Sequence, residues 1–421
     1  PIDLPIVLKD HQDPRSLHTH QSVHIQPSDP AACCGCGACL AICPVQAIGM
    51  VRNQEGFDYP EVDSAKCVRC GQCRRVCPWI ERPPAPEPPY DSRAYAAWHL
   101  DPQIRAASSS GGVFTALAEQ VVAGGGLVSG AIFNPDFTGV RHLLASTARE
   151  LPLFRTSKYV QSDIGTETYH GIRQALDAGH TVLFSGCPCQ VAGLRLFLQS
   201  DYPNLLTCAV ACHGISSPGW FQHYRAQCDI ARESPVVDFS FRNKAKGWKK
   251  FQIRQVLRNG QVLQEYFGHN YFMWSFLRNL CLRYTCYECR YKGDNMPADI
   301  LLADFWGVGS LHSEFDTDDR GTSLVVLMTN KGFKAIEDIA DRLFLAEVDF
   351  ESAIGKNPPI RFSFARPPLR RKFLRDAFRR KLPVLMKKYP ISPAPSLWVR
   401  GIGKARKLLR SWIKASRSES A

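Results

Sequence analysis

Residues 33–44 read CCGCGACLAICP and residues 67–78 read CVRCGQCRRVCP, which are two copies of the pattern C-x2-C-x2-C-x3-C-P. Four cysteines and the closing proline of the first copy recur 34 residues later in the second. Such a loop aims three thiolates at one four-iron cubane, while the fourth cysteine reaches across to another. The repeat therefore predicts a small pseudo-twofold domain built around two clusters.

The spacing assigns ligands to both [4Fe-4S] clusters. One set is Cys33, Cys36, Cys39 and Cys77, and the other is Cys67, Cys70, Cys73 and Cys43. Zinc bound by four thiolates is the alternative, because paired C-x-x-C elements also suit zinc. Eight cysteines in two ferredoxin spacings favour the clusters, and Cys34, between two ligands, is interpreted as a bystander.

The composition outside this unit divides the 421 residues into further segments. The stretch ERPPAPEPPY at residues 81–90 predicts extended polyproline and a domain boundary, because proline fixes φ. The predicted segments are a leader at 1–30, the ferredoxin domain at 31–80, a Pro-rich linker at 81–92, an α/β body at 93–355 in two parts (about 93–180 and 181–355), and a basic tail at 356–421.

The chain carries 17 cysteines but no apolar run of the ~20 residues needed to cross a bilayer. Its first residues also lack the basic and apolar regions of a signal peptide. In such a context the cysteines indicate metal or redox chemistry rather than disulfides. We therefore expect a cytoplasmic protein, although the basic tail suggests a peripheral location at the inner face of the membrane.

The formal net charge of +13 is concentrated near the C-terminal end. From Arg366 onward, 17 Lys and Arg oppose Asp376 and Glu419, which leaves the other 365 residues near −2. A near-neutral body has no basic groove, so no nucleic-acid partner is expected. Residues 396–421 have the spacing of an amphipathic helix with Trp398 and Trp412 on its apolar face. This suits an anionic membrane surface, and docking on the chain itself or on a protein partner is the alternative.

Beyond the linker, short β-rich runs alternate with helical spacing. Strands are predicted at 94–100, 127–133, 140–144, 181–186, 205–211, 237–241, 251–257, 261–267, 299–303 and 323–329, and helices at 112–122, 168–178 and 187–198. This alternation predicts an α/β body with a mixed sheet behind the small ferredoxin-like domain.

A second group of cysteines lies in this body, at predicted strand ends and in one loop. They are Cys189, Cys212, Cys286 and Cys289. Strand ends of an open α/β sheet face a common crevice, so these thiols would close a third cluster, and scattered buried thiols are the alternative. Cys187 and Cys281 compete as ligands because each is near an assigned one.

Several polar residues suit a phosphate-bearing ring cofactor. Residues 108–112 (SSSGG) precede a helix, where their hydroxyls can cap it and their N–H groups can meet an anion; an ordinary cap is the alternative. Lys158, Lys244 and Trp248 offer cations and an aromatic face, or are simply surface residues. Asp304 follows a strand, where it is a candidate ligand or a turn residue.

These motifs together resemble the coenzyme F-420 hydrogenase/dehydrogenase beta-subunit family, in its members with an N-terminal two-cluster ferredoxin unit. The resemblance runs through SSGGVFTAL at 109–117, SKYVQS at 157–162, PCQ at 188–190, CHG at 212–214, CYEC at 286–289 and DILLADFWG at 299–307. It implies an FAD-binding body with its own cluster. Cys187 and Ala303 depart from the family pattern, so the ligand set and the flavin wall stay open there.

The resemblance also implies roles for single residues. The implied ligands of the body cluster are Cys189, Cys212, Cys286 and Cys289, and the implied cofactor-binding residues are Ser109, Ser110, Gly111, Gly112 and Lys158. Lys244, Trp248 and Asp304 are added as cofactor-binding candidates by their chemistry. His213 and Lys158 have suitable chemistry for proton transfer and are the candidate catalytic residues.

The resulting hypothesis is an iron-sulfur flavoprotein oxidoreductase. Three [4Fe-4S] clusters and FAD would pass electrons between a one-electron carrier, such as ferredoxin or another redox protein, and a two-electron small-molecule acceptor or coenzyme F-420. The alternative is a non-catalytic electron-transfer subunit that serves a separate catalytic partner, for which the basic tail suggests a place at the membrane. A zinc-stapled scaffold is the third hypothesis.

Overall fold

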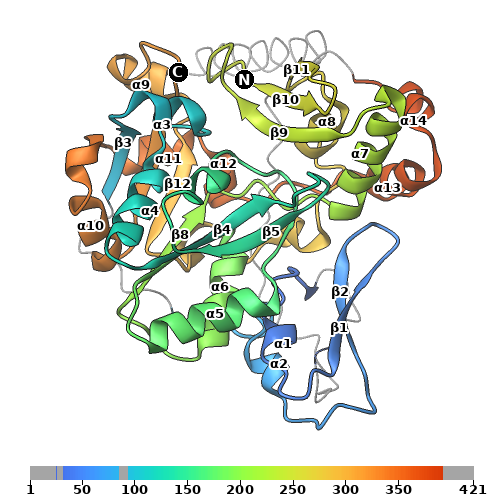
Figure 1. Cartoon of the computed structure of the whole chain (residues 1–421), viewed down its shortest axis with the longest axis horizontal. Coiled ribbons are helices and arrows are strands. Elements are labelled where there is room, and N and C mark those ends of the chain that lie inside the picture. Colours follow the sequence, from blue (N-terminus) through green and yellow to red (C-terminus); the bar gives the residue numbers. More distant parts are fainter. Residues whose placement is uncertain (1–24, 26–31, 85–92, 392–421) are drawn as a thin grey trace, which may run out of the picture.

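The computed structural model describes residue 25, residues 32–84 and residues 93–391. The leader with its histidines, most of the linker and the amphipathic segment at 396–421 lie outside the described residues. The chain forms a small N-terminal unit beside a larger body with a nine-stranded sheet (Figure 1). The expected fold class, a ferredoxin-type unit followed by a mixed-sheet α/β body, is confirmed.

The N-terminal unit repeats one plan twice. Each C-x2-C-x2-C loop leads into a single helical turn that starts after a glycine with positive φ, Gly37 (φ 81°) or Gly71 (φ 72°). These two glycines occupy the same position of the repeat, where a side chain would strain the left-handed backbone. The elements are α1 (Ala38–Ala41), α2 (Gln72–Arg75) and the antiparallel pair β1 (Ile48–Arg52) and β2 (Asp58–Val62).

The body is organised around a mixed sheet of order β14-β3-β13-β12-β8-β7-β4-β5-β6. Neighbours from β12 through β8 and β7 to β4 run parallel, and β5 pairs β6 parallel, whereas the remaining pairs are antiparallel. The strands are β3 (Arg93–His99), β4 (Leu127–Phe133), β5 (Val140–Ala145), β6 (Ser162–Asp163), β7 (Val182–Gly186), β8 (Leu205–Val210), β12 (Ile300–Asp304), β13 (Ser323–Leu327) and β14 (Leu343–Val348).

Helices cover both faces of this sheet because its central strands are apolar on both sides. Val182 and Phe184 of β7 point into the core shared with α5 (Thr166–Asp177) and α6 (Pro188–Leu198). Leu183, between them, points into the opposite core with α4 (Val113–Ala123) and α10 (Asn330–Glu337). Such alternation is the period of a strand.

A second core packs a three-stranded antiparallel sheet against helices and is rich in aromatic rings. Its strands are β9 (Val236–Asn243), β10 (Gln252–Leu257) and β11 (Val262–Tyr266), with α7 (Pro218–Arg232) and α8 (Tyr271–Leu277) beside them. A hairpin joins β10 to β11 through Gly260 at φ 86°. The remaining helices are α3 (Pro102–Ala107), α9 (Val308–Leu311), α11 (Phe350–Gly355), α12 (Pro358–Arg361), α13 (Arg370–Arg379) and α14 (Leu382–Lys388).

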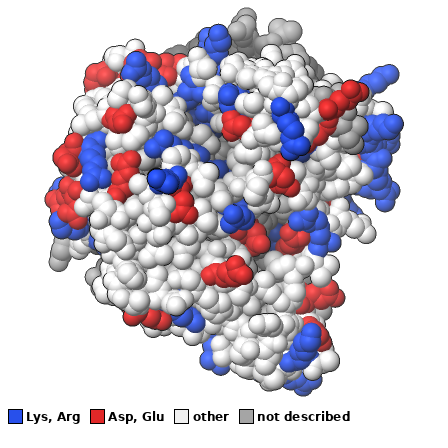
Figure 2. Space-filling model, in the orientation of Figure 1, with Lys and Arg blue, Asp and Glu red and all other residues white. Residues whose placement is uncertain are grey.

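The expected boundary between body and tail, at residue 355, needs correction. Phe373, Leu374 and Ala377 of α13 are fully buried in the aromatic core, and the Tyr271 hydroxyl donates to the Tyr389 carbonyl. One apolar stripe under a strongly basic face is enough to dock such a helix, although its mean composition suggests a solvated tail. The body therefore extends at least to Ile391, and Figure 2 shows its Lys and Arg side chains gathered over α13 and α14.

The N-terminal unit is docked on the body through buried contacts. Ala38 and Ala41 of α1 belong to the same core as α5 and α6, and the Tyr169 hydroxyl donates to the Cys36 carbonyl (2.9 Å). The Arg370 guanidinium forms two hydrogen bonds with the Glu55 carboxylate (2.8 and 2.7 Å). The first copy of the repeat is therefore part of the body's core.

Among the described residues, no helix has both the length and the apolar character needed to span a membrane.

Candidate functional site

Cysteines from both copies of the repeat lie together in the N-terminal unit. Cys39, Cys73 and Cys77 share one buried apolar cluster. Backbone N–H groups donate to two sulfurs, from Ile25 to Cys73 (3.3 Å) and from Ala47 to Cys43 (3.2 Å). Burial raises the pKa of Cys77 to about 12, so its thiolate form requires a compensating cation, which is what cluster iron provides.

Arg283 makes a direct contact with one predicted ligand. Its guanidinium is completely buried and donates to the Cys33 sulfur (3.4 Å), the Cys33 carbonyl (2.7 Å) and the Asp58 carbonyl (2.9 Å). It also lies over the Tyr59 ring, 4.2 Å from the centroid. This places a fixed positive charge from the body beside a predicted cluster ligand.

The body cysteines gather at one place, as the strand-end argument expected. Cys187 follows β7 and is the N-cap residue of α6, and Cys189 lies in the first turn of that helix. Cys212 follows β8, and Cys286 and Cys289 of the C-x-x-C lie in and directly after a 3-10 turn. All five pack around Ile215 and Tyr291, and Cys34 joins them. The body thiol group consists of Cys34, Cys187, Cys189, Cys212, Cys286 and Cys289.

Two of these contacts bear on the open question of ligands. The Cys187 thiol hydrogen-bonds Cys212 and lowers the pKa of Cys212 to about 6. Hydrogen bonds from Cys189 and Cys36 lower the pKa of Cys34. Cys34 therefore contacts thiols of both groups, and its interpretation as a bystander that binds no iron stays a prediction. Cys281 lies apart in the aromatic core, where Ser275 donates to its sulfur, so it does not compete as a ligand.

Within the described parts of the chain, no three His, Cys, Asp or Glu side chains converge as they would on one metal ion.

A cavity of about 310 Å³ lies at the carboxyl ends of β7, β8 and β12. This is where open α/β sheets bind their ligands, and the volume is at the small end of the range for cofactor sites. Cys187 and Cys212 form part of its wall, so the cavity directly adjoins the body thiol group. Its wall includes these sequence-predicted residues: Ser109, Ser110, Gly112, Lys158, His213 and Asp304.

The serine loop before α4 does not cap the helix as expected. Gly112 is the cap residue, in the left-handed conformation (φ 90°), and no side chain bonds the first turn. The hydroxyls instead hold the loop, since Ser109 contacts Ser157 (2.9 Å) and Ser110 donates to the Thr322 carbonyl (2.7 Å). The free N–H end of an eleven-residue helix therefore borders the cavity, which favours an anion there.

Gly111 stands behind this loop, not in the cavity wall. A Cβ there would lie 2.2 Å from the Ala97 carbonyl, so only glycine allows the loop to approach β3. The expected binding role of Gly111 is thus replaced by a close backbone contact.

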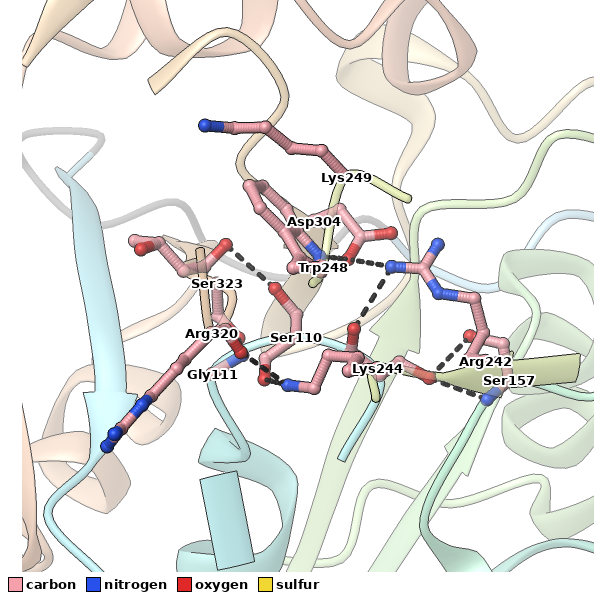
Figure 3. Close-up of polar contacts among 12 residues, drawn as sticks. Ser110, Gly111, Ser157, Arg242, Lys244, Trp248, Lys249, Asp304, Arg320 and Ser323 are labelled. Atoms are coloured by element: carbon pink, nitrogen blue, oxygen red, sulfur yellow. Dashed lines mark hydrogen bonds and ion pairs between the residues drawn. The ribbon is translucent and has the colours of Figure 1, made fainter. Parts of the chain in front are cut away.

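Asp304 occupies the end of β12 and is held by two donors (Figure 3). Arg242 donates to its Oδ1 (2.9 Å) and Trp248 Nε1 donates to the same oxygen (2.9 Å). Arg242 also donates to the Ser109 carbonyl (3.0 Å), so it ties this carboxylate to the serine loop. Trp248 is buried and stacks on Trp306 with centroids 4.8 Å apart, so it supports Asp304 without lining the cavity.

Lys244 likewise lies on the far side of the serine loop. Its ammonium donates to the carbonyls of Arg105 (2.7 Å), Ser110 (2.8 Å) and Arg320 (2.5 Å), as Figure 3 shows in part. Three carbonyl acceptors satisfy a lysine ammonium completely. This position indicates that Lys244 holds the serine loop in place. The sequence-based expectation that Lys244 contacts a cofactor does not fit this position, because Lys244 does not line the cavity.

The two candidate catalytic residues differ in what they can do. Burial lowers the pKa of Lys158 to about 7, and its ammonium donates to the carbonyls of Leu153 (2.9 Å) and Arg155 (2.8 Å). Burial lowers the pKa of His213 to about 4, so its ring is neutral near pH 7. His213 Nε2 is 2.7 Å from Asn279 Oδ1, which assigns the proton to Nε2 and leaves Nδ1 as an acceptor. Lys158 is therefore the better cation and proton donor.

Sequence reasoning missed two arginines at the site. Arg155 lines the cavity, and its buried Nε has no partner among the described residues. A buried guanidinium nitrogen without an acceptor fits an anionic group in the cavity. Arg242 starts the segment RNKAKGW, from which sequence reasoning selects Lys244 and Trp248 but not the arginine. Neither position carries a motif that distinguishes it from a surface charge.

Two family models match the chain. Residues 179–353 match the C terminus of the coenzyme F420 hydrogenase/dehydrogenase beta subunit, and residues 32–79 match the 4Fe-4S dicluster domain. No curated protein matches the chain. Among solved structures, it is similar to a chain of the xenon-derivatized F420-reducing [NiFe] hydrogenase complex from Methanosarcina barkeri. The identity is 17% over 73% of this chain and 94% of that one, with a TM-score of 0.42.

Proposed function

We propose, from the match of residues 179–353 to the C terminus of the coenzyme F420 hydrogenase/dehydrogenase beta subunit and of residues 32–79 to a 4Fe-4S dicluster domain, that the chain is an iron-sulfur flavoprotein oxidoreductase. It would connect a one-electron carrier with a two-electron organic substrate or deazaflavin coenzyme. The matches to the two family models support an iron-sulfur electron-transfer protein. The FAD, the third cluster and the substrate are our proposal.

One observation carries this proposal. Cys187 and Cys212 belong both to the cavity wall and to the body thiol group, and Cys34 joins that group to the dicluster unit. Electrostatic interactions between neighbouring thiols lead from the exposed Cys70 through Cys73, Cys39 and Cys77 to Cys34 and the body thiol group. Such a series of thiols is expected in a protein that binds several redox centres one after another.

The residues around the cavity fit a flavin dinucleotide. The uncapped start of α4, the unpartnered Arg155 Nε and the Lys158 ammonium provide positive potential for phosphates. The carboxylate of Asp304, held by Arg242, provides an acceptor. A flavin bound there would supply the conversion between one-electron and two-electron chemistry.

The ligands proposed for the body cluster are Cys189, Cys212, Cys286 and Cys289, with Cys187 beside Cys212 as the competing thiol. Cys34 and Tyr291 then separate this centre from the dicluster unit. The Tyr291 hydroxyl donates to the Pro78 carbonyl, directly after Cys77. The same side chain thus packs among the body thiols and holds the residue that follows Cys77.

The proposal is tested on protein prepared without oxygen. A reduced ferredoxin added as donor should bleach first the iron-sulfur absorption and then the flavin band, and a small-molecule acceptor such as coenzyme F420 should restore both. Protein that retains no flavin would refute the flavoprotein part. Turnover that needs an added protein subunit would favour the electron-transfer subunit, for which the basic face of α13 and α14 is a suitable contact surface.

A further inference from the structure

The two copies of the cysteine repeat differ in the charge of their side chains. Residues 33–44 contain no charged side chain, whereas residues 67–78 contain Arg69, Arg74 and Arg75. With the 34-residue offset, these arginines replace Gly35, Leu40 and Ala41 of the first copy. The four repeated cysteines and the glycine before each helical turn do not account for this difference, because they are the same in both copies.

The neutral surface of the first copy is buried against the body. Ala41 is 4% exposed against α5 and α6, and Cys36 is 7% exposed. A Cβ on Gly35 would lie 2.2 Å from Gln161 Nε2, so the loop is in direct contact with the body. The surface of the apolar copy is therefore already covered by the body of the same chain.

The corresponding face of the second copy has nothing of the described chain on it. The Cys70 side of this copy is exposed, Val68 is 60% exposed, and Lys66, Arg69 and Arg75 are exposed around them. We call the surface formed by Lys66, Val68, Arg69, Cys70, Arg74 and Arg75 the outer-cluster face. It bears four cations, and Asp63, paired with Lys66 at 3.2 Å, is the acidic group in contact with it.

We propose that the outer-cluster face is the docking site of a small acidic one-electron carrier protein. This deepens the proposed function and rests on it. The pseudo-twofold repeat makes the face equivalent to the covered one, an exposed valine provides a central apolar contact, and the arginines provide a rim complementary to carboxylates. A predicted cluster ligand, Cys70, lies at its centre.

The electron balance at this face is simple. The reduced carrier loses one electron and the outer cluster gains one, with no bond formed or broken and no proton transferred. The carrier's acidic surface has to approach and leave repeatedly, which favours a steered, weak encounter over a buried apolar interface.

The test compares two charge-reversal variants of the full chain. Arg69→Asp with Arg75→Glu changes the outer-cluster face, and aspartate tolerates the positive φ of residue 69 (56°) better than most residues. Lys372→Asp with Arg379→Glu makes the same change of charge on exposed residues of α13, which lies away from α1 and α2 of the dicluster unit (Figure 1). Iron content of both variants is checked against the wild type.

Stopped-flow absorption measures reduction of the iron-sulfur band by two donors, a reduced acidic plant-type [2Fe-2S] ferredoxin and a photoreduced, uncharged deazariboflavin. We expect the face variant to lose about tenfold or more in the ferredoxin rate constant at low salt and to lose its salt dependence. The α13 variant should keep both. Deazariboflavin should reduce all three proteins equally.

Other outcomes overturn the proposal. Equal ferredoxin rates in the face variant and the wild type, or equal losses in both variants, would remove the docking site from this face. The face variant losing binding to anionic vesicles while keeping its ferredoxin rate would assign the face to a membrane instead. A wild type that neither donor bleaches would refute the proposed function itself, and with it the docking proposal. Salt independence of the wild-type rate would contradict steering even if the face variant failed to fold.

Discussion

Replacing Arg283 by glutamine tests the coupling between the body and the inner cluster of the dicluster unit. The guanidinium is buried, carries the positive charge closest to Cys33 and donates to its sulfur at 3.4 Å. A reduced cluster is one unit more negative than an oxidised one, so a neighbouring cation stabilises the reduced form. The variant should therefore have a lower reduction potential at the cluster held by Cys33, Cys36, Cys39 and Cys77.

The magnitude follows from Coulomb's law. A unit charge roughly 6 Å from the cluster centre, at an effective dielectric constant of about 20, contributes about 3 kcal/mol. At 59 mV for each tenfold change of a one-electron equilibrium, this corresponds to roughly 100 mV. Partial hydration of the space left by the guanidinium reduces the effect, so a fall of about 50–150 mV is expected.

The assay is a redox titration followed by electron paramagnetic resonance, which resolves individual clusters. Arg370→Gln is the matched control, because Arg370 is also buried and docks the dicluster unit through Glu55 but bonds no thiol. Its clusters should keep their potentials, although both variants should lose stability. Equal shifts in the two variants would refute the reasoning, since they would reflect loosened docking and not the charge beside Cys33.

Three further predictions concern the cavity, the body thiols and the C-terminal segment. Burial lowers the pKa of Lys158 to about 7, so its positive charge is lost as pH rises through that value. The affinity of flavin-depleted protein for FAD, measured by fluorescence titration, should therefore fall severalfold from about pH 6 to about pH 8, whereas Lys158→Met should show no such change. The same pH dependence in Lys158→Met and in the wild type would show that Lys158 does not contact a phosphate. Cys212→Ala should lower the iron content by about four per chain while Cys281→Ala leaves it unchanged, and equal iron in both would remove Cys212 from the ligand set. Deleting residues 396–421 should weaken sedimentation with anionic vesicles without changing the visible spectrum, and unchanged sedimentation would dismiss the membrane surface.

Much of the fold follows from local pattern. The strands β3, β4, β7 and β8 lie within a residue or two of their predicted positions, because their apolar runs are bounded by glycine or by turn residues. The dicluster unit follows from cysteine spacing alone. The positions of Cys189 and Cys212 at strand ends predict that the two residues lie together, and they do.

The rest depended on contacts distant in sequence. Arg283 is separated from Cys33 by 250 residues, and nothing in its surroundings marks it as buried beside a thiol. The basic composition of α13 concealed the apolar stripe that docks it, and Cys34 gained a partner only when α6 brought Cys189 to it. Serine hydroxyls expected at the start of α4 instead bond residues of other loops, because the fold offers them better acceptors.

The most direct test of the central claim is the iron, sulfide and flavin content of the full chain prepared without oxygen. The account predicts brown protein with about twelve irons, about twelve sulfides and one flavin for each chain. About eight irons with no flavin would leave the dicluster unit but remove the path from Cys34 to the cavity. A colourless, iron-poor protein would contradict the electron-transfer account altogether.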